Sequence, residues 1–182
     1  MSENKDIVIH NKDRAVPIEE YARLPKVPVT VVLDNLRSSF NVGAIFRTAE
    51  CARIERVVTC GITAHPPHDK VLKTSLGTTE FVPHLHLPTV SDALAMAREA
   101  GARIVALETT SRSRTLYAPL EKKPTFLFLG NEALGLSREV VEQADEVVEI
   151  PLLGYKNSLN VSVALGIALF EILRQWGELD RK

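Results

Sequence analysis

The chain has 182 residues, of which 45% are hydrophobic and 25% are charged, and its net charge is −1. This length fits one domain, or one domain with a short arm, and the hydrophobic content suffices for a buried core. The pI near 6.5 argues against a general polyanion binder, since nucleic-acid-binding domains often have a pI above about 9. Any contact with a nucleic acid must therefore use a local basic patch.

Signals for export or membrane insertion are absent from the sequence. The longest apolar run, residues 161–170, is too short to span a bilayer and is interrupted by Ser162 and Gly166. The charged first residues lack the apolar stretch of a signal peptide. Cys51 and Cys60 cannot form a disulfide framework, and we expect both to be small buried residues. We therefore expect a cytoplasmic protein.

Residues 1–27 are predicted to form an N-terminal arm, and residues 28–182 the folded domain. The arm is polar and contains Pro17 and Pro25, although residues 18–22 could form one helical turn. Two interpretations remain open for the arm: it is frayed, or it contacts a substrate or partner.

From Val29 onward, β-branched runs alternate with segments of helical periodicity. Strands are predicted at residues 29–33, 56–60, 81–85, 103–107, 125–129 and 146–150. The third is expected at a sheet edge, because Pro83 cannot donate a ladder hydrogen bond. Helices are predicted at residues 41–52, 71–76 and 91–100, and from 157 or 158 to 176, with Ser91 as an N-cap. This alternation predicts an α/β protein with a mostly parallel sheet and helices on both faces.

The final predicted helix is apolar almost all the way round, which indicates burial on more than one side. In a chain this short, we expect the protein's own sheet to cover one side and a second subunit to cover another.

Two common kinds of ligand site are disfavoured. Residues 130–137 resemble a phosphate-binding loop, but Leu136 replaces the required lysine, and no GxGxxG occurs in the chain. His65 and His68 could hold a metal, as could His84 and His86 on one strand face. No cysteine or carboxylate completes a tetrahedral set at a familiar spacing, so we expect surface histidines and no metal.

Three separated segments carry the strongest functional signal: Asn41-Val-Gly-Ala-Ile-Phe-Arg47, residues 126–135 (FLFLGNEALG), and Ile150-Pro-Leu-Leu-Gly154 running into residues 158–164 (SLNVSVA). In this order and with these gaps, they resemble the three signature motifs of the SpoU/TrmH branch of the SPOUT RNA 2'-O-ribose methyltransferases. The resemblance covers residues 28–176. It implies a trefoil-knotted SPOUT fold, a homodimer and S-adenosyl-L-methionine as the cofactor.

The second and third segments follow predicted strands, where α/β proteins bind their ligands. A ligand there would meet backbone groups, and the resemblance implies that this ligand is S-adenosylmethionine. The predicted cofactor-binding residues are Leu107, Glu108, Thr109, Gly130, Asn131, Glu132, Ile150, Leu152, Ser158 and Leu159. Family members often carry an arginine or methionine where this chain has Leu152 and Leu153, and a site made of backbone groups should tolerate the difference.

The resemblance implies catalytic roles for Arg47, Asn41, Glu132, Ser158 and Asn160. Arg47 matches an arginine that family mechanisms place at the ribose hydroxyl, sometimes as a base. Lowering a guanidinium pKa from about 13 to about 8 would cost about 7 kcal/mol. We therefore favour Arg47 as a phosphate and alkoxide ligand, with a deprotonated Arg47 as the alternative. Asn41 is expected at a helix N-cap, orienting Arg47 or the ribose. Glu132 is expected to accept hydrogen bonds from backbone amides or Asn160.

The expected substrate is a ribose 2'-hydroxyl, the group that distinguishes RNA from DNA. We favour tRNA over rRNA, because the chain lacks the extra N-terminal RNA-binding domain of many rRNA-modifying relatives. Arg112 and Arg114, after a strand end, are candidates for contacts with the RNA backbone. A non-catalytic RNA-binding protein and a base methyltransferase of the wider SPOUT group remain as alternatives.

Overall fold

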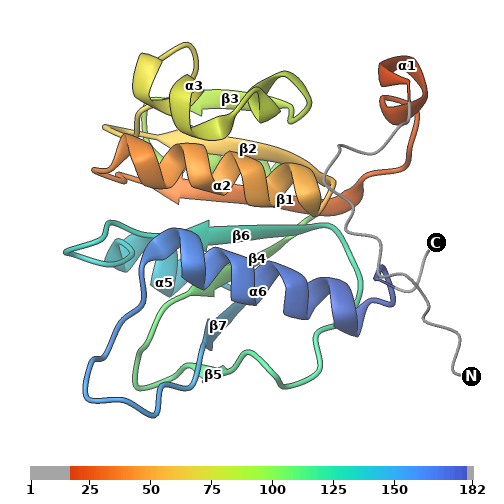
Figure 1. Ribbon diagram of the computed structural model, residues 1–182. Coiled ribbons are helices and arrows are strands. Elements are labelled where there is room, and N and C mark those ends of the chain that lie inside the picture. Colours follow the sequence, from red (N-terminus) through yellow and green to blue (C-terminus); the bar gives the residue numbers. More distant parts are fainter. Residues whose placement is uncertain (1–16, 180–182) are drawn as a thin grey trace, which may run out of the picture.

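The computed structural model describes residues 17–179, which form a seven-stranded sheet with helices on both faces (Figure 1). The strand order is β3-β2-β1-β6-β4-β7-β5, and every neighbouring pair is parallel. The strands are β1 (Val27–Asp34), β2 (Ile54–Cys60), β3 (His84–Leu87), β4 (Arg103–Leu107), β5 (Arg114–Thr115), β6 (Thr125–Leu129) and β7 (Glu146–Glu149). The helices are α1 (Ile18–Tyr21), α2 (Ser39–Cys51), α3 (Asp69–Ser75), the 3-10 helix η1 (Thr78–Glu80), α4 (Val90–Glu99), α5 (Arg138–Gln143) and α6 (Val161–Gln175).

The core consists of two apolar layers, one on each face of the sheet. Alternate residues of a strand point to opposite faces, so Val31 of β1 joins the layer beneath α2 and α6, whereas Val32 joins the layer beneath α4 and α5. Figure 1 shows α2 and α6 side by side across one face, with α5 behind the sheet. The continuous β-branched runs of the sequence are thus explained by burial on both sides.

The predicted α/β architecture is confirmed, and β4 and β6 have the predicted bounds. β3 starts later than predicted, because Pro83 precedes the strand and contributes only its carbonyl, which accepts a hydrogen bond from the Val57 amide at 2.9 Å. The predicted position of β3 at a sheet edge is correct. Three short elements, η1, β5 and α5, were not predicted.

The helix starts differ from the prediction because other side chains cap them. Thr89, rather than Ser91, caps α4, since Thr89 forms a reciprocal capping box with Asp92. Ser91 instead donates its hydroxyl hydrogen bond to Glu139 of α5, at 2.8 Å. The cap of α2 is Ser38, and that of the final helix is Asn160, so this helix starts at Val161 rather than at 157 or 158.

The described part of the predicted arm packs against the domain. The Tyr21 hydroxyl donates a hydrogen bond to Glu50 of α2 at 2.7 Å, and its ring meets Phe81 edge-on. Residues 1–16 lie outside the described residues, so a separate role for the whole arm stays a prediction. Cys60 is buried as expected, but Cys51 is exposed, which corrects the prediction for that residue. None of the helices from 17 to 179 has the length and apolar character needed to cross a membrane.

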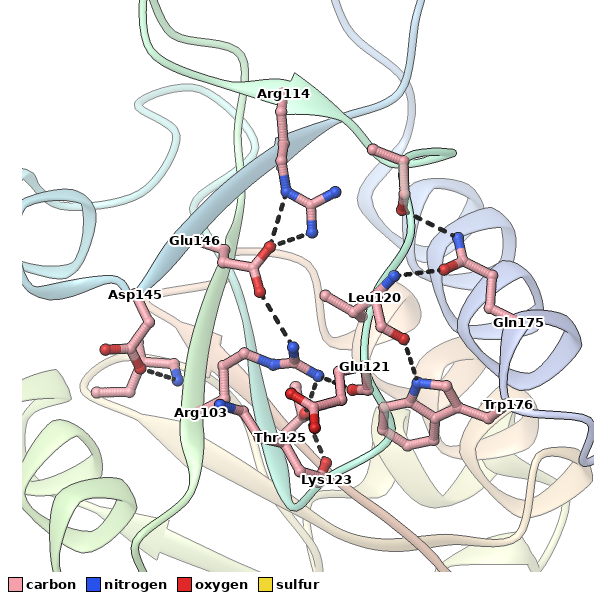
Figure 2. A network of polar contacts seen from close by, with 12 residues as sticks. Arg103, Arg114, Leu120, Glu121, Lys123, Thr125, Asp145, Glu146, Gln175 and Trp176 are labelled. Atoms are coloured by element: carbon pink, nitrogen blue, oxygen red, sulfur yellow. Dashed lines mark hydrogen bonds and ion pairs between the residues drawn. The ribbon is translucent and has the colours of Figure 1, made fainter.

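A polar network fixes the loop that joins β5 to β6 (Figure 2). Arg103 of β4 has a side chain that is only 4% exposed, and it pairs with Glu146 of β7 at 3.1 Å. Arg114 of β5 pairs with the same carboxylate. Gln175 and Trp176, at the end of α6, donate hydrogen bonds to carbonyls of this loop. The loop is therefore attached to the end of α6.

We predict that Glu146→Ala lowers the free energy of unfolding by about 3 kcal/mol, because it leaves the buried Arg103 guanidinium without its charged partner. Glu142→Ala is the matched control, since it breaks an exposed pair with Arg138 and should cost less than about 1 kcal/mol. Chemical denaturation of both variants measures the difference. Equal losses in the two variants would contradict the assigned role of Glu146.

Candidate active site

A cavity of about 600 Å³ opens at the carboxyl ends of β4, β6 and β7. Its walls come from the loops that follow these three strands and from the first turn of α6. This is the edge at which parallel α/β proteins bind ligands, and the volume lies within the range of small-molecule sites, about 300–1,000 Å³.

All ten residues predicted to bind the cofactor line this one cavity: Leu107, Glu108, Thr109, Gly130, Asn131, Glu132, Ile150, Leu152, Ser158 and Leu159. Their contacts with a cofactor stay a prediction. Sequence reasoning missed the apolar wall formed by Leu129, Leu136, Val141 and Val161. Leu136 could have been found from its place at the end of the second motif, but Val141 lies on the unpredicted helix α5.

The loop after β6 is built as a tight backbone turn. Asn131 and Gly135 exchange two backbone hydrogen bonds of 3.0 and 2.8 Å, and the Asn131 side chain accepts hydrogen bonds from the amides of Ala133 and Leu134. A Cβ on Gly130 would lie 2.2 Å from the Gly135 carbonyl carbon. Gly135 has a φ of +71°, which also favours glycine. The two glycines of the motif are thus required by backbone approach and conformation.

Glu132 joins this loop to the start of α2. Its carboxylate accepts hydrogen bonds from the backbone amides of Arg37 and Ser38, at 2.8 and 3.1 Å, and from the side-chain amide of Asn41, at 2.9 Å. Burial acts to raise the pKa of Glu132, but these hydrogen bonds outweigh it, so the pKa lies below its ordinary value. The side chain is therefore a carboxylate at neutral pH.

The Asn41 side chain extends the connection to the third motif. Its Oδ1 accepts a hydrogen bond from Asn160 Nδ2 at 3.1 Å, and Asn160 Oδ1 caps α6 by accepting from the Ser162 amide at 3.0 Å. Glu132, Asn41 and Asn160 thus form one chain of hydrogen bonds across all three segments. Asn41 lies in the first turn of α2 rather than at its cap, which corrects one expectation. Of the two donors expected for Glu132, the backbone amides are confirmed, whereas the Asn160 amide bonds to Asn41 instead.

Glu108 forms a second tie between cavity loops. One of its carboxylate oxygens accepts a hydrogen bond from the Leu136 amide at 2.8 Å, and the other accepts from the Thr109 amide at 2.9 Å. The same carboxylate lies where a side chain on Gly135 would have to go. Glu108 therefore holds the loop after β4 against the loop after β6.

The structure does not bring every predicted residue to the cavity. Ser158 lines it, but the exposed side chain of Arg47 lies on α2 and has no hydrogen bond or ion pair within residues 17–179. Arg114 pairs with Glu146 and has a half-buried side chain, whereas Arg112 is exposed. Their contacts with the RNA backbone stay a prediction.

The family follows from the comparison with known proteins. The model described as "SpoU rRNA Methylase family" matches residues 28–170. The chain belongs to the SpoU rRNA methylase family. A curated relative, the 23S rRNA (guanosine-2'-O-)-methyltransferase RlmB of Pseudomonas aeruginosa, is 34% identical over 154 residues, which are 85% of this chain and 62% of that protein. The chain thus spans just under two thirds of the length of this relative.

Two solved structures of SpoU family members have the same fold. The TrmH/SpoU tRNA modifying enzyme of A. aeolicus is 30% identical, with a TM-score of 0.77 over 88% of this chain and 81% of that one. The SpoU methyltransferase AviRb of Streptomyces viridochromogenes, in complex with the cofactor AdoMet, is 26% identical, with a TM-score of 0.73 over 90% of this chain and 63% of that one. These neighbours place the α/β sheet described above in the SPOUT class.

The Glu132 hydrogen bonds should contribute a stability that depends on pH. The folded-state pKa is lowered, so the contribution is present above the unfolded pKa of about 4.3 and disappears as the pH falls through the lower folded value. We expect Glu132→Gln to be less stable than the parent by on the order of 1 kcal/mol at pH 7, and this gap should shrink below about pH 4.

Urea denaturation at pH 7 and at acidic pH measures this gap. Glu80→Gln, which removes an exposed carboxylate from η1, controls for the loss of one negative charge. A gap that is the same at both pH values would show that the ionised form of Glu132 is not what holds the loop.

Proposed function

We propose that this protein is an S-adenosylmethionine-dependent RNA ribose 2'-O-methyltransferase. One observation carries the proposal: the Glu132–Asn41–Asn160 hydrogen bonds join the three motif segments beside a cavity that residues of the second and third segments line. Membership of the SpoU family supports it, as do relatives named for methyl transfer to RNA.

The residues present fit S-adenosylmethionine. The cavity has the volume of a small-molecule site, and Gly130, Ile150 and Leu152 are among the residues that line it. Apolar side chains such as Leu136 and Val161 line another part and suit a flat adenine ring. When bound, the cofactor supplies an activated methyl group to the reaction.

The chain's own residues have the tasks of positioning and charge stabilisation. The side-chain nitrogen of Asn41 donates a hydrogen bond to Glu132, and its oxygen accepts one from Asn160. We therefore propose that Asn41 positions the loops rather than orienting Arg47. Ser158 lies within the cavity and would shape the region that receives the ribose. The exposed guanidinium of Arg47 would bind the phosphate beside the target ribose and stabilise the developing alkoxide, because a bidentate fork suits oxyanions.

For the substrate we propose structured RNA, and tRNA in preference to rRNA. The likeness to the A. aeolicus relative, which is named as a tRNA modifying enzyme and has a TM-score of 0.77, supports tRNA. The test is transfer of a labelled methyl group to purified tRNA and to rRNA. Alkaline hydrolysis then reveals ribose methylation, which protects the adjacent phosphodiester. No transfer to either RNA would reject the proposal, and a product cleaved by alkali would indicate base methylation.

We predict that Arg47→Ala abolishes methyl transfer while cofactor affinity stays within about threefold, since Arg47 lies outside the cavity. Arg47→Lys should also be severely impaired, because a point charge does not replace a bidentate fork. Single-turnover transfer and calorimetry measure the two properties. Arg138→Ala, which removes another exposed helical arginine, should behave like the parent. Loss of cofactor binding in Arg47→Ala would refute this division of roles.

We also propose a homodimer that pairs through α6. Val163 and Phe170 of this helix are 51% and 40% exposed, and with Ile167 between them they follow the spacing of one helical face. The opposite face, which includes Leu165, Leu169 and Ile172, is buried in the core. An apolar stripe of this kind suits a self-complementary interface.

The expected mass in light scattering at micromolar concentration is twice the 20.1 kDa of one chain. We predict that Phe170→Asp yields a folded monomer, because this exposed residue can accept a charge without disturbing the core. Ile18→Asp places the same charge on an exposed apolar residue of α1 and should leave the dimer intact. A monomeric parent protein would refute the proposed pairing.

A further inference from the structure

A second cavity, of about 420 Å³, lies at the carboxyl ends of β2 and β3. Its walls come from the loop at residues 61–68 and from His86 of β3. The residues that give it its chemistry are Ile62, Ala64, His65, Pro67, His68 and His86. Ile62 is 70% exposed, so the cavity presents apolar surface and imidazole rings to solvent.

Two histidines form a flat platform in this cavity. The rings of His65 and His86 are stacked, with centroids 4.1 Å apart and an interplanar angle of 22°. Each ring is anchored through Nδ1: His65 to the Pro66 carbonyl at 2.9 Å, and His86 to the Thr59 hydroxyl at 3.0 Å. The rings are therefore fixed in place, and their Nε2 atoms are not used in these contacts.

The chemistry of this platform suits a planar ring rather than a phosphate or a metal. Burial, and secondarily the nearby His65, lower the pKa of His86, which keeps that imidazole neutral at pH 7. A neutral imidazole lacks the charge that pairs with phosphate. Within residues 17–179, no group of three or more histidine, cysteine or carboxylate side chains is placed to hold a metal ion.

Asn35 links this second cavity directly to the candidate active site. Its side-chain oxygen accepts a hydrogen bond from the Ile62 amide at 3.1 Å, and its carbonyl accepts one from Asn131 Nδ2 at 2.7 Å. The two cavities lie along the same edge of the sheet, on opposite sides of β1. Neighbouring strands are about 4.8 Å apart, so one extended ligand can reach both cavities.

We propose that His65 and His86 stack against an unpaired base of the RNA substrate, adjacent to the nucleotide that is methylated. The proposal rests on the proposed function, since it assigns the second cavity to the same RNA. Proteins that recognise RNA commonly stack splayed bases on aromatic side chains, including histidine. The exposed Lys70 and Lys73 of α3, which follows the loop, provide positive charge for the adjoining phosphates.

The test combines His65→Ala with His86→Ala in the full chain. Stacking contributes about 1–3 kcal/mol per base, so RNA affinity should fall about 5- to 150-fold. With bulk tRNA as the substrate, KM should rise while kcat and the affinity for S-adenosylhomocysteine stay unchanged. A second variant, His86→Phe, retains a flat ring and should retain most of the affinity. His84→Ala is the matched control, because His84 lies on the same strand but contacts Phe46.

A fluorescent single-stranded RNA 12-mer, compared with an abasic 12-mer of the same backbone, tests the nature of the contact. The parent protein should prefer the RNA with bases, and the double variant should lose this preference. The inference is overturned if the double variant keeps the parent's KM, or if both 12-mers bind the parent equally. A parent protein that methylates neither tRNA nor rRNA would instead reject the proposed function. In that case the comparison of the two 12-mers would still test whether the histidines stack on a base.

Discussion

The carboxyl edge of the sheet depends on one carboxylate, that of Glu132. It accepts hydrogen bonds from two backbone amides just before α2 and from the side-chain amide of Asn41. These are the amides of Arg37 and of the N-cap residue Ser38, which precede the first residue of α2 and lie near the partial positive charge at its N-terminus. A negatively charged side chain from another loop satisfies them and is itself stabilised. This exchange fixes a loop that begins after β6 against a helix that begins more than ninety residues earlier.

The consequence is a cavity with walls that come from distant parts of the chain yet are joined by hydrogen bonds. Asn41 accepts a hydrogen bond from Asn160, and Asn160 caps α6. Glu108, in the loop after β4, accepts a hydrogen bond from the Leu136 amide in the loop after β6. Binding sites of this kind need little reorganisation when a ligand enters, because the loops are already held in place. Asn35 extends the same connection across β1 to the stacked histidines.

Local sequence patterns predicted the parts of the fold that local physics decides. The continuous apolar runs predicted β1, β4 and β6, because a strand buried on both faces is apolar along nearly its whole length. The pattern could not choose between Ser91 and Thr89 as a cap, since both hydroxyls can cap and the choice depends on Asp92. The short helix α5, with its single buried residue Val140, carries too little periodicity to be recognised.

In the candidate site too, local sequence patterns predicted some features and could not predict others. Seven of the ten residues predicted to bind the cofactor, including Gly130 and Ser158, belong to the motif segments, whereas Leu107, Glu108 and Thr109 follow from the end of β4; all ten line the cavity. Long-range pairings could not be read from spacing: the Glu132–Asn41 bond spans 91 positions, and the ion pair of Arg114 with Glu146 depends on β5 lying beside β7.

The most direct test of this account is calorimetric titration of the protein with S-adenosylhomocysteine, for the parent and for Glu132→Ala. Glu139→Ala removes a glutamate of α5 that bonds to Ser91 and serves as the control. The account predicts one site per chain in the parent and in the control, and affinity at least tenfold weaker in Glu132→Ala, because the loops that form the cavity are released. Equal affinity in the parent and in Glu132→Ala would contradict the central role of this carboxylate.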